Sequence, residues 1–153
     1  MARVLVMSIK PRYADRIFAG EKTVELRRTR PRVESGDVVL VYASAPTKAL
    51  VGAFAIGGVI SEEVSCLWNR YSSMLGVSHK EYREYFAGTG MAHGLLVAEY
   101  VSFVPVPLSV LRRRVGFRPP QSYMFWSRGL DELVSRTART LLESISATSP
   151  AAA

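Results

Sequence analysis

Three ionisable residues lie close together in the sequence, directly after a glycine. They are Lys22, Glu25 and Arg27, and they follow Gly20. A lysine and an arginine can bind phosphate oxygens and stabilise negative charge that develops in a transition state. A glutamate within hydrogen-bonding distance can take a proton from a ribose 2′-hydroxyl or from water. The types and spacing of these residues therefore predict a polar pocket that handles a phosphate or the edge of a base.

The three side chains can converge only if the backbone is irregular near Gly20. In an ideal strand Lys22 would point to the face opposite Glu25, and a glycine turn permits a departure from that geometry. The alternative is an ordinary ion pair between Glu25 and Arg27 on a strand face, with Lys22 solvated. Exposed pairs contribute only about 0–1 kcal/mol, so stability alone is a weak reason for the cluster.

Local patterns place this motif between a short helix and a half-buried strand. An apolar run predicts a strand at Val4–Ile9, and Pro11 stands at a favourable first-turn position for the helix Pro11–Ala19. Gly20 is suited to end that helix. Apolar and polar residues then alternate over Thr23–Arg28, which predicts a strand with one buried face.

The rest of the chain mixes strand and helix patterns without a repeating βαβ rhythm, so the expected fold class is α+β. Glycines at 52, 57 and 58 interrupt one long strand and predict bulges that would curl the sheet into a small, partly closed barrel. Further strands are expected at Val38–Ala43, Leu50–Ile60, Gly94–Val104 and Tyr123–Trp126. Further helices are expected at 64–75, 78–86, 108–115 and, amphipathic and C-terminal, 130–141. Ser78 and Glu81 have the spacing of a capping box at the start of the helix 78–86.

The 153 residues fit one domain, expected over residues 1–145, with a flexible tail at 146–153. No apolar run approaches the roughly 18 residues of a membrane span, so no membrane association is expected. The first residues do not have the pattern of a signal peptide, and the one cysteine, Cys66, permits no internal disulfide. We therefore expect a cytoplasmic protein in which Cys66 packs in the core.

The net charge of +7 favours polyanionic partners without demonstrating one. Residues 1–48 hold ten Lys/Arg against five Asp/Glu, and residues 100–130 hold five arginines and no acid. Two basic stretches on one face would suit nucleic acid, whereas solubility is the alternative explanation. Two histidines far apart and one cysteine give no zinc-ligand spacing, and no metal or cofactor is expected.

The pattern G-x-K-x-x-E-x-R, formed by Gly20, Lys22, Glu25 and Arg27, resembles the ASCH family of the PUA-like superfamily. Its flanks agree: the segments 8–11, 36–37, 41–46 and, later, 119–123 are similar to family elements. The resemblance implies a PUA-like small mixed β-barrel with peripheral helices and a cleft beside the first helix. It also implies RNA or a modified nucleoside as ligand.

Some members that this sequence resembles are thought to be ribonucleases or amidohydrolases of acetylated cytidine, and others RNA-binding or coactivator-like modules. The amidohydrolase type has a threonine nucleophile where this chain has Glu25, and Thr23 lies two residues away. This departure disfavours amide cleavage, although a carboxylate at this position can activate water.

Further candidates for contact with nucleic acid lie outside the motif. Tyr42 could stack on a base or serve as a core-edge aromatic, and Ser44 could bond to a base edge or a phosphate. Phosphate could also sit near the start of the first helix. The full set of expected nucleic-acid contacts is Lys10, Arg12, Lys22, Arg27, Tyr42, Ser44, Arg118, Gln121 and Tyr123.

Three hypotheses follow, in order of preference. The first is an RNA-binding protein that recognises single-stranded RNA or a modified nucleoside in the cleft. The second is a metal-independent ribonuclease in which Glu25 is the base and Lys22 and Arg27 are electrophilic clamps. The third is a transcription-related adaptor that docks through the C-terminal helix. The sequence also leaves a homodimer as an alternative, because that helix can pack on its own sheet or on a second copy of the chain.

Overall fold

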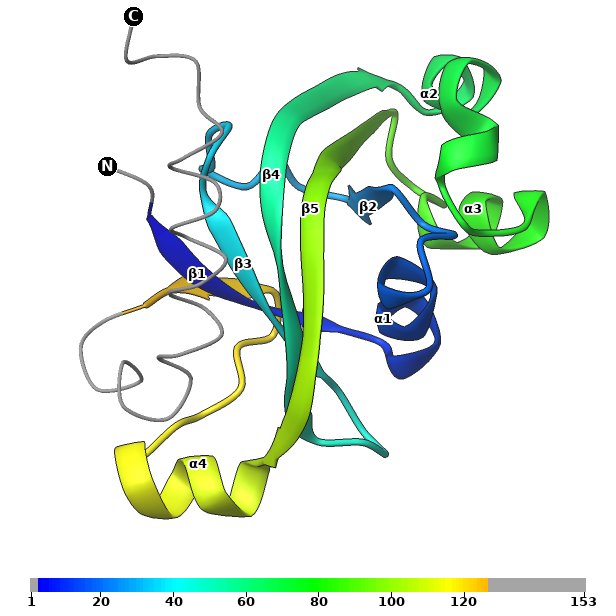
Figure 1. Cartoon of the computed structure of the whole chain (residues 1–153). Coiled ribbons are helices and arrows are strands. Elements are labelled where there is room, and N and C mark those ends of the chain that lie inside the picture. Colours follow the sequence, from blue (N-terminus) through cyan, green and yellow to red (C-terminus); the bar gives the residue numbers. More distant parts are fainter. Residues whose placement is uncertain (1–2, 127–153) are drawn as a thin grey trace, which may run out of the picture.

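Figure 1 shows the computed structural model, which describes residues 3–126. Within those residues, six strands form one mixed sheet in the order β2-β5-β4-β3-β1-β6. The pair β1–β3 is parallel and the other neighbouring pairs are antiparallel. The strands are β1 (Val4–Ile9), β2 (Val24–Arg27), β3 (Val38–Ala43), β4 (Ala49–Glu63), β5 (Met91–Pro107) and β6 (Tyr123–Phe125).

The helices of the described residues are α1 (Pro11–Phe18), α2 (Val64–Tyr71), the 3₁₀ turn η1 (Ser72–Met74), α3 (His79–Tyr85) and α4 (Leu108–Val115). They gather at opposite ends of the two long strands β4 and β5 (Figure 1). Helices α2 and α3 lie toward one end with α1, and α4 lies at the other. Among residues 3–126, no helix is long and apolar enough to cross a membrane.

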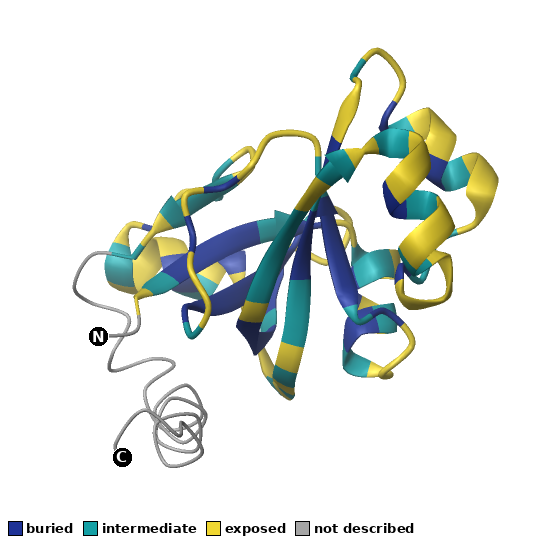
Figure 2. Ribbon diagram, turned by 90° about the horizontal axis from the view of Figure 1, so that it is seen from above, coloured by how far each residue is buried: buried dark blue, intermediate teal, exposed yellow. Residues whose placement is uncertain are grey.

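The central strands are buried on both faces, as Figure 2 shows by their dark colour. Side chains alternate along a strand, so Met7 and Ile9 of β1 pack with Ile17 of α1 on one face. Val6, on the other face, packs with Leu111 of α4. Burying an aliphatic side chain contributes about 1.5–3 kcal/mol. These contacts fix α1 against the concave face of the sheet and α4 against the opposite face.

Bulges bend the long β4–β5 pair where the sequence predicted them. The register between the two strands shifts next to Gly52 and again between Ile56 and Gly58. Gly52 also permits close packing, because a Cβ there would lie 2.6 Å from the carbonyl oxygen of Val101 and 2.4 Å from the ring of Phe18. The predicted bulges are therefore confirmed, and one of them makes room for α1.

The α+β class is confirmed, and the sheet of the small, partly closed barrel that we expected is not closed. Among the described strands, β2 is hydrogen-bonded only to β5, and β6 only to β1, so these two strands are the edges of an open sheet. The physical reason is that β2 has only four residues, and side chains rather than backbone span the gap between it and β1. We refer to this gap as the seam.

The predicted bounds of β1 and β3 agree with the structure, whereas β4 and β5 extend beyond the predicted segments. Cys66 is exposed on α2, so the expectation that it packs in the core is wrong. The predicted C-terminal helix at 130–141 and the tail at 146–153 lie outside the described residues.

Candidate active site in the seam

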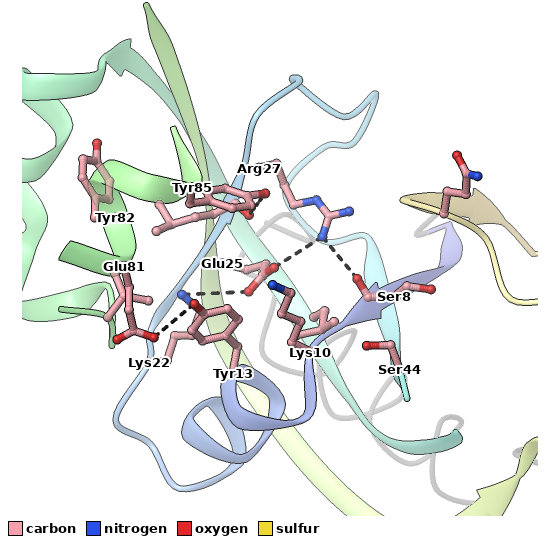
Figure 3. A pocket seen from close by; sticks show the side chains of 14 residues that line it. Ser8, Lys10, Tyr13, Lys22, Glu25, Arg27, Ser44, Glu81, Tyr82 and Tyr85 are labelled. Carbon is pink, nitrogen blue, oxygen red and sulfur yellow. Dashed lines mark hydrogen bonds and ion pairs between the residues drawn. The ribbon is translucent and has the colours of Figure 1, made fainter. Parts of the chain in front are cut away.

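A pocket of about 300 Å³ opens in the seam, between the end of β1 and strand β2 (Figure 3). Helix α1 and helix α3 supply its other walls, and the loop before β6 supplies part of its mouth. The residues that line it are Ser8, Ile9, Lys10, Tyr13, Lys22, Glu25, Leu26, Arg27, Ser44, Val77, Glu81, Tyr82, Tyr85 and Gln121. The pocket therefore lies where the sheet is not closed by backbone hydrogen bonds.

Strand alternation directs Glu25 into this pocket. Val24 and Leu26 point the other way, into an apolar cluster with Leu75 and Phe86 beneath the helices α2 and α3. Glu25 therefore faces the concave side, where it is only 5% exposed. A carboxylate at that depth requires cationic partners, because burying an unpaired charge is very costly.

Lys22 is one of those partners, and it is itself buried, with 2% of its surface exposed. It precedes β2, so strand alternation does not govern it, and its Nζ lies 4.0 Å from Oε2 of Glu25. The Nζ also donates a hydrogen bond of 2.7 Å to the carbonyl oxygen of Leu75. The alternative of a solvated Lys22 is therefore wrong. Burial lowers the pKa of Lys22, and the negative charge of Glu25 opposes that shift.

A glycine in the turn after η1 allows Lys22 to be enclosed. Gly76 has a φ of +62°, and a Cβ there would lie only 2.6 Å from the Cβ of Lys22. Its carbonyl oxygen accepts a hydrogen bond of 2.7 Å from Arg16 of α1. The backbone N–H of Thr23 donates to the carbonyl oxygen of Met74 at 2.9 Å. The turn at 74–76 is therefore locked onto the segment that carries Lys22.

Arg27 is the second cationic partner of Glu25 and also the bridge across the seam. One guanidinium nitrogen lies 3.4 Å from Oε1 of Glu25 and 3.4 Å from the carbonyl oxygen of Ser8 in β1. The other donates to the hydroxyl of Ser122, just before β6, at 2.8 Å. Through this side chain β2, at one edge of the sheet, contacts β1 and the residue before β6, at the other edge. The dashed lines from Arg27 in Figure 3 show the contacts with Glu25 and Ser8.

One oxygen of the buried carboxylate is left without a hydrogen bond. Oε2 of Glu25 has no hydrogen-bond partner within residues 3–126, although the Lys22 ammonium lies 4.0 Å away. An unsatisfied buried polar atom costs about 1–3 kcal/mol. This oxygen is itself buried, and it belongs to a residue that lines the pocket.

Helix α3 presents a second carboxylate, which is held by a helix cap. Ser78 and Glu81 form the capping box that the sequence predicted. Hydrogen bonds from the backbone of Ser78 and from Tyr13, with the charge of Arg16, lower the pKa of Glu81 to about 2. Glu81 thus stays ionised and joins α1 to α3 across the pocket.

Tyrosine hydroxyls at the pocket walls are held as hydrogen-bond donors. The hydroxyl of Tyr13 donates to Glu81 at 3.1 Å, and that of Tyr85 donates to the carbonyl oxygen of Leu26 at 3.0 Å. Desolvation raises the pKa of both hydroxyls. These rings therefore supply fixed, neutral walls rather than proton-transfer groups.

The structure brings several of the predicted contact residues to the pocket. Lys10, Ser44 and Gln121 join Lys22 and Arg27 in its lining. Arg12 does not line it, but its guanidinium donates to the hydroxyl of Tyr13 at 3.1 Å.

Three other predicted contact residues lie away from the pocket. Tyr42 is buried on the opposite face of the sheet, where its ring tilts against Phe117 at 5.6 Å. Arg118 is exposed and does not line the pocket. Tyr123 also lies outside the lining, and its hydroxyl accepts a hydrogen bond from the backbone of Arg32.

Sequence reasoning missed five residues that shape the site. Of these, only Glu81 had a usable signal, because the capping box fixed its position at the start of a helix. The others depend on contacts between segments far apart in the chain. The five are Ser8, Tyr13, Gly76, Glu81 and Tyr85.

No group of three or more His, Cys, Asp and Glu residues in the described part of the chain is arranged to hold a metal ion. Beside Glu25, the groups positioned to stabilise negative charge are the side chains of Lys22 and Arg27.

Comparison with known proteins identifies the family of this chain. Residues 7–104 match the profile of the ASCH domain. The chain belongs to the ASCH domain family. The matched stretch contains the motif and α3, whereas Gln121 and Ser122 lie beyond it.

Individual relatives span most of the chain. A Zymomonas mobilis protein described as an ASCH domain-containing ribonuclease is 34% identical over 137 residues, which cover 88% of this chain and 92% of that protein. A crystal structure of ASCH from Zymomonas mobilis has a TM-score of 0.82 at 32% identity, covering 88% of this chain and 96% of the other. A hypothetical protein from Leishmania major, at 12% identity and a TM-score of 0.53, shares the fold alone; the match covers 92% and 97% of the two chains.

Replacing Gly76 with alanine should test how Lys22 is enclosed. Gly116 is a matched control, because it has the same φ of +62° but no atom within 4 Å of the position that a Cβ would take. Both variants should lose about 1 kcal/mol for the left-handed backbone. Gly76→Ala should lose about 1–3 kcal/mol more, because its Cβ overlaps Lys22. Urea unfolding measures the difference, and equal losses would contradict close packing of the turn on Lys22.

The lowered pKa of Glu81 should be visible in the pH dependence of stability. A carboxylate whose pKa is depressed from 4.5 to about 2 stabilises the fold above pH 4.5, and this contribution is lost as the pH falls toward 2. Glu81→Gln keeps a capping-box side chain but removes the charge. Parent and variant should therefore differ by about 1 kcal/mol at pH 7 and converge near pH 2. Thermal unfolding across this range provides the test, and a constant difference would be the contrary result.

Proposed function

We propose that this protein is a ribonuclease that acts on single-stranded RNA in the seam pocket. The observation that carries the proposal is the buried Glu25 carboxylate, which lines the pocket between two cations and has one oxygen without a hydrogen-bond partner among the described residues. Such an arrangement combines a proton acceptor with two stabilisers of negative charge, and phosphodiester cleavage requires both.

Each charged residue has a role in this proposal. Oε2 of Glu25 takes the proton of a ribose 2′-hydroxyl, and the 2′-oxygen attacks the adjacent phosphorus. Lys22 and Arg27 offset the charge that develops on the phosphate oxygens. The P–O5′ bond then breaks, and the leaving oxygen needs a proton. Because burial lowers the pKa of Lys22, its ammonium is a stronger acid than an exposed lysine and is suited to supply that proton.

The depth of the site favours single-stranded substrate. Glu25 is 5% exposed and lies among the tyrosines of α1 and α3, so a nucleotide must leave a stack to reach it. Single-stranded RNA can splay out a nucleotide in this way, and aromatic walls suit an unstacked base. Lys10, Ser44 and Gln121 at the mouth offer further contacts to the sugar and phosphate.

Similarity supports the same activity. The Zymomonas mobilis protein described as a ribonuclease is aligned over 88% of this chain, a span long enough to include the motif. RNA is therefore the partner that we propose for this chain. The adaptor and homodimer hypotheses depend on residues beyond 126 and have no comparable support.

A second candidate is recognition of RNA or a modified nucleoside without turnover. The same free oxygen could accept a hydrogen bond from a base amino group instead of a proton from a sugar. Amide cleavage through Thr23 is less well supported, because the hydroxyl of Thr23 is directed to the carbonyl oxygen of Met74 at 3.4 Å.

A cleavage assay separates the two candidates. End-labelled single-stranded RNA is incubated in EDTA with the parent, with Lys22→Ala, and with Lys80→Ala, whose side chain on α3 is 80% exposed. The parent and Lys80→Ala should release fragments at similar rates. Lys22→Ala should be at least about 100-fold slower, because a charge stabiliser of the transition state is missing. Cleavage by Lys22→Ala at the parental rate would contradict the catalytic proposal. Intact RNA in every lane would favour recognition of RNA without cleavage.

The pH profile of cleavage provides an independent check of Lys22. If its ammonium is the proton donor, activity should decline on the alkaline side at a pH below 10.5, the ordinary lysine pKa, because burial lowers that value. Lys22→Arg keeps the positive charge but cannot release the proton, since arginine stays protonated. It should cleave poorly at every pH after subtraction of uncatalysed RNA hydrolysis. A fully active Lys22→Arg would show that charge alone is needed.

A further inference from the structure

A row of polar side chains extends from Arg27 across the rim of the concave face. Arg27 of β2 pairs with His93 of β5, and His93 pairs with Ser61 of β4. Directly paired residues of neighbouring strands lie on the same face of a sheet. Each strand spacing is about 4.8 Å, so the row reaches about 10 Å from Arg27. The concave face therefore carries polar groups well beyond the seam pocket.

The outer end of this row is organised by hydrogen bonds. The guanidinium of Arg30, in the loop after β2, donates to the hydroxyl of Ser61 at 2.9 Å. That hydroxyl lies 2.8 Å from Nδ1 of His93. Burial, and secondarily the charge of Arg30, lower the pKa of His93, so its ring is neutral at pH 7. Nδ1 then accepts the hydroxyl proton of Ser61, and Nε2–H is left as a donor.

This cluster therefore offers donors and a positive charge to a ligand. The bond to Ser61 uses one N–H of the Arg30 guanidinium, and an arginine side chain has five such donors. Glu62, the next residue along β4, points to the opposite face and pairs with Arg70. Glu63 shares the face of Ser61 but lies two residue pairs further out, opposite Met91. An anion at Arg30 thus meets no carboxylate in the row formed by the paired residues of β2, β5 and β4.

We propose that Arg30, Ser61 and His93 form a second phosphate subsite, which holds a phosphodiester of the RNA strand next to the nucleotide in the seam pocket. This inference rests on the proposed function, because it assigns the path of the same substrate. The strand crosses the ends of β2, β5 and β4, and Arg27 lies between the pocket and the subsite. Basic groups that track a backbone in this way are typical of single-strand binding.

Binding of an uncleavable RNA tests the subsite separately from catalysis. A fluorescent single-stranded octanucleotide with 2′-fluoro groups, which has no 2′-oxygen nucleophile, is titrated with the parent and with Arg30→Ala at several salt concentrations. Arg113→Ala is the matched control, because Arg113 is also exposed and lies on α4. Arg30→Ala should raise the Kd about three- to tenfold, with the parental melting temperature. The slope of log K for binding against log salt concentration should also become shallower by about 0.7, because one phosphate contact is lost.

The outcomes distinguish the two proposals. If RNA is cleaved but Arg30→Ala binds the octanucleotide as the parent does, the subsite is wrong and the proposed function stands. If Arg113→Ala weakens binding as much as Arg30→Ala, the loss of affinity comes from the lower net positive charge of the protein, and the subsite proposal is again wrong. If inorganic phosphate at constant ionic strength displaces the octanucleotide, the cluster is a free-anion site rather than part of an RNA path. No binding of the octanucleotide by the parent would overturn both proposals.

Discussion

The structure depends on one buried interaction, in which the carboxylate of Glu25 lies between the side chains of Lys22 and Arg27. Glu25 and Lys22 are almost fully buried and Arg27 is mostly so. The Glu25 carboxylate attracts both cations, so removing it would leave two buried like charges uncompensated, and losing such a partner typically costs about 3–5 kcal/mol. The group also joins four parts of the chain. Lys22 is bonded to the turn after η1, Glu25 belongs to β2, and Arg27 contacts β1 and the loop before β6.

This interaction explains why the sheet is open at the seam. Closing β2 onto β1 with backbone hydrogen bonds would produce a barrel and leave no room in the seam. Instead, the guanidinium of Arg27 spans the gap, and the space beside it is a pocket of about 300 Å³. The bulges at the glycines of β4 curl the sheet far enough for one side chain to reach across. The fold therefore combines the curvature of a barrel with an accessible interior.

Much of the fold was predictable because local patterns were strong. Alternation and β-branched runs gave β1 and β3, and the capping box located α3. The three charged residues of the motif also converge in the seam pocket. Tyr42 shows where such reasoning fails. Its strand is buried on both faces, so alternation could not decide which face meets the pocket. Tyr42 turned out to pack against Phe117 on the far side.

The remaining errors concern contacts between distant segments. Arg27 meets Ser122, which is 95 residues away in the chain, and no local pattern encodes that pairing. The enclosure of Lys22 likewise requires Gly76 and the carbonyl oxygen of Leu75, which belong to a turn between two helices. A solvated lysine and a buried one look alike in the sequence, because the difference lies in what packs over them. Tertiary packing thus decided the burial, and hence the chemistry, of residues that the motif had identified.

The most direct test of the central claim is a crystal structure with single-stranded RNA that carries a 2′-deoxy or 2′-fluoro group at the position of cleavage. The account predicts that the 2′ position lies next to Oε2 of Glu25, with the adjacent phosphate between Lys22 and Arg27. RNA bound along the basic helix α4, with the seam pocket unoccupied, would contradict it.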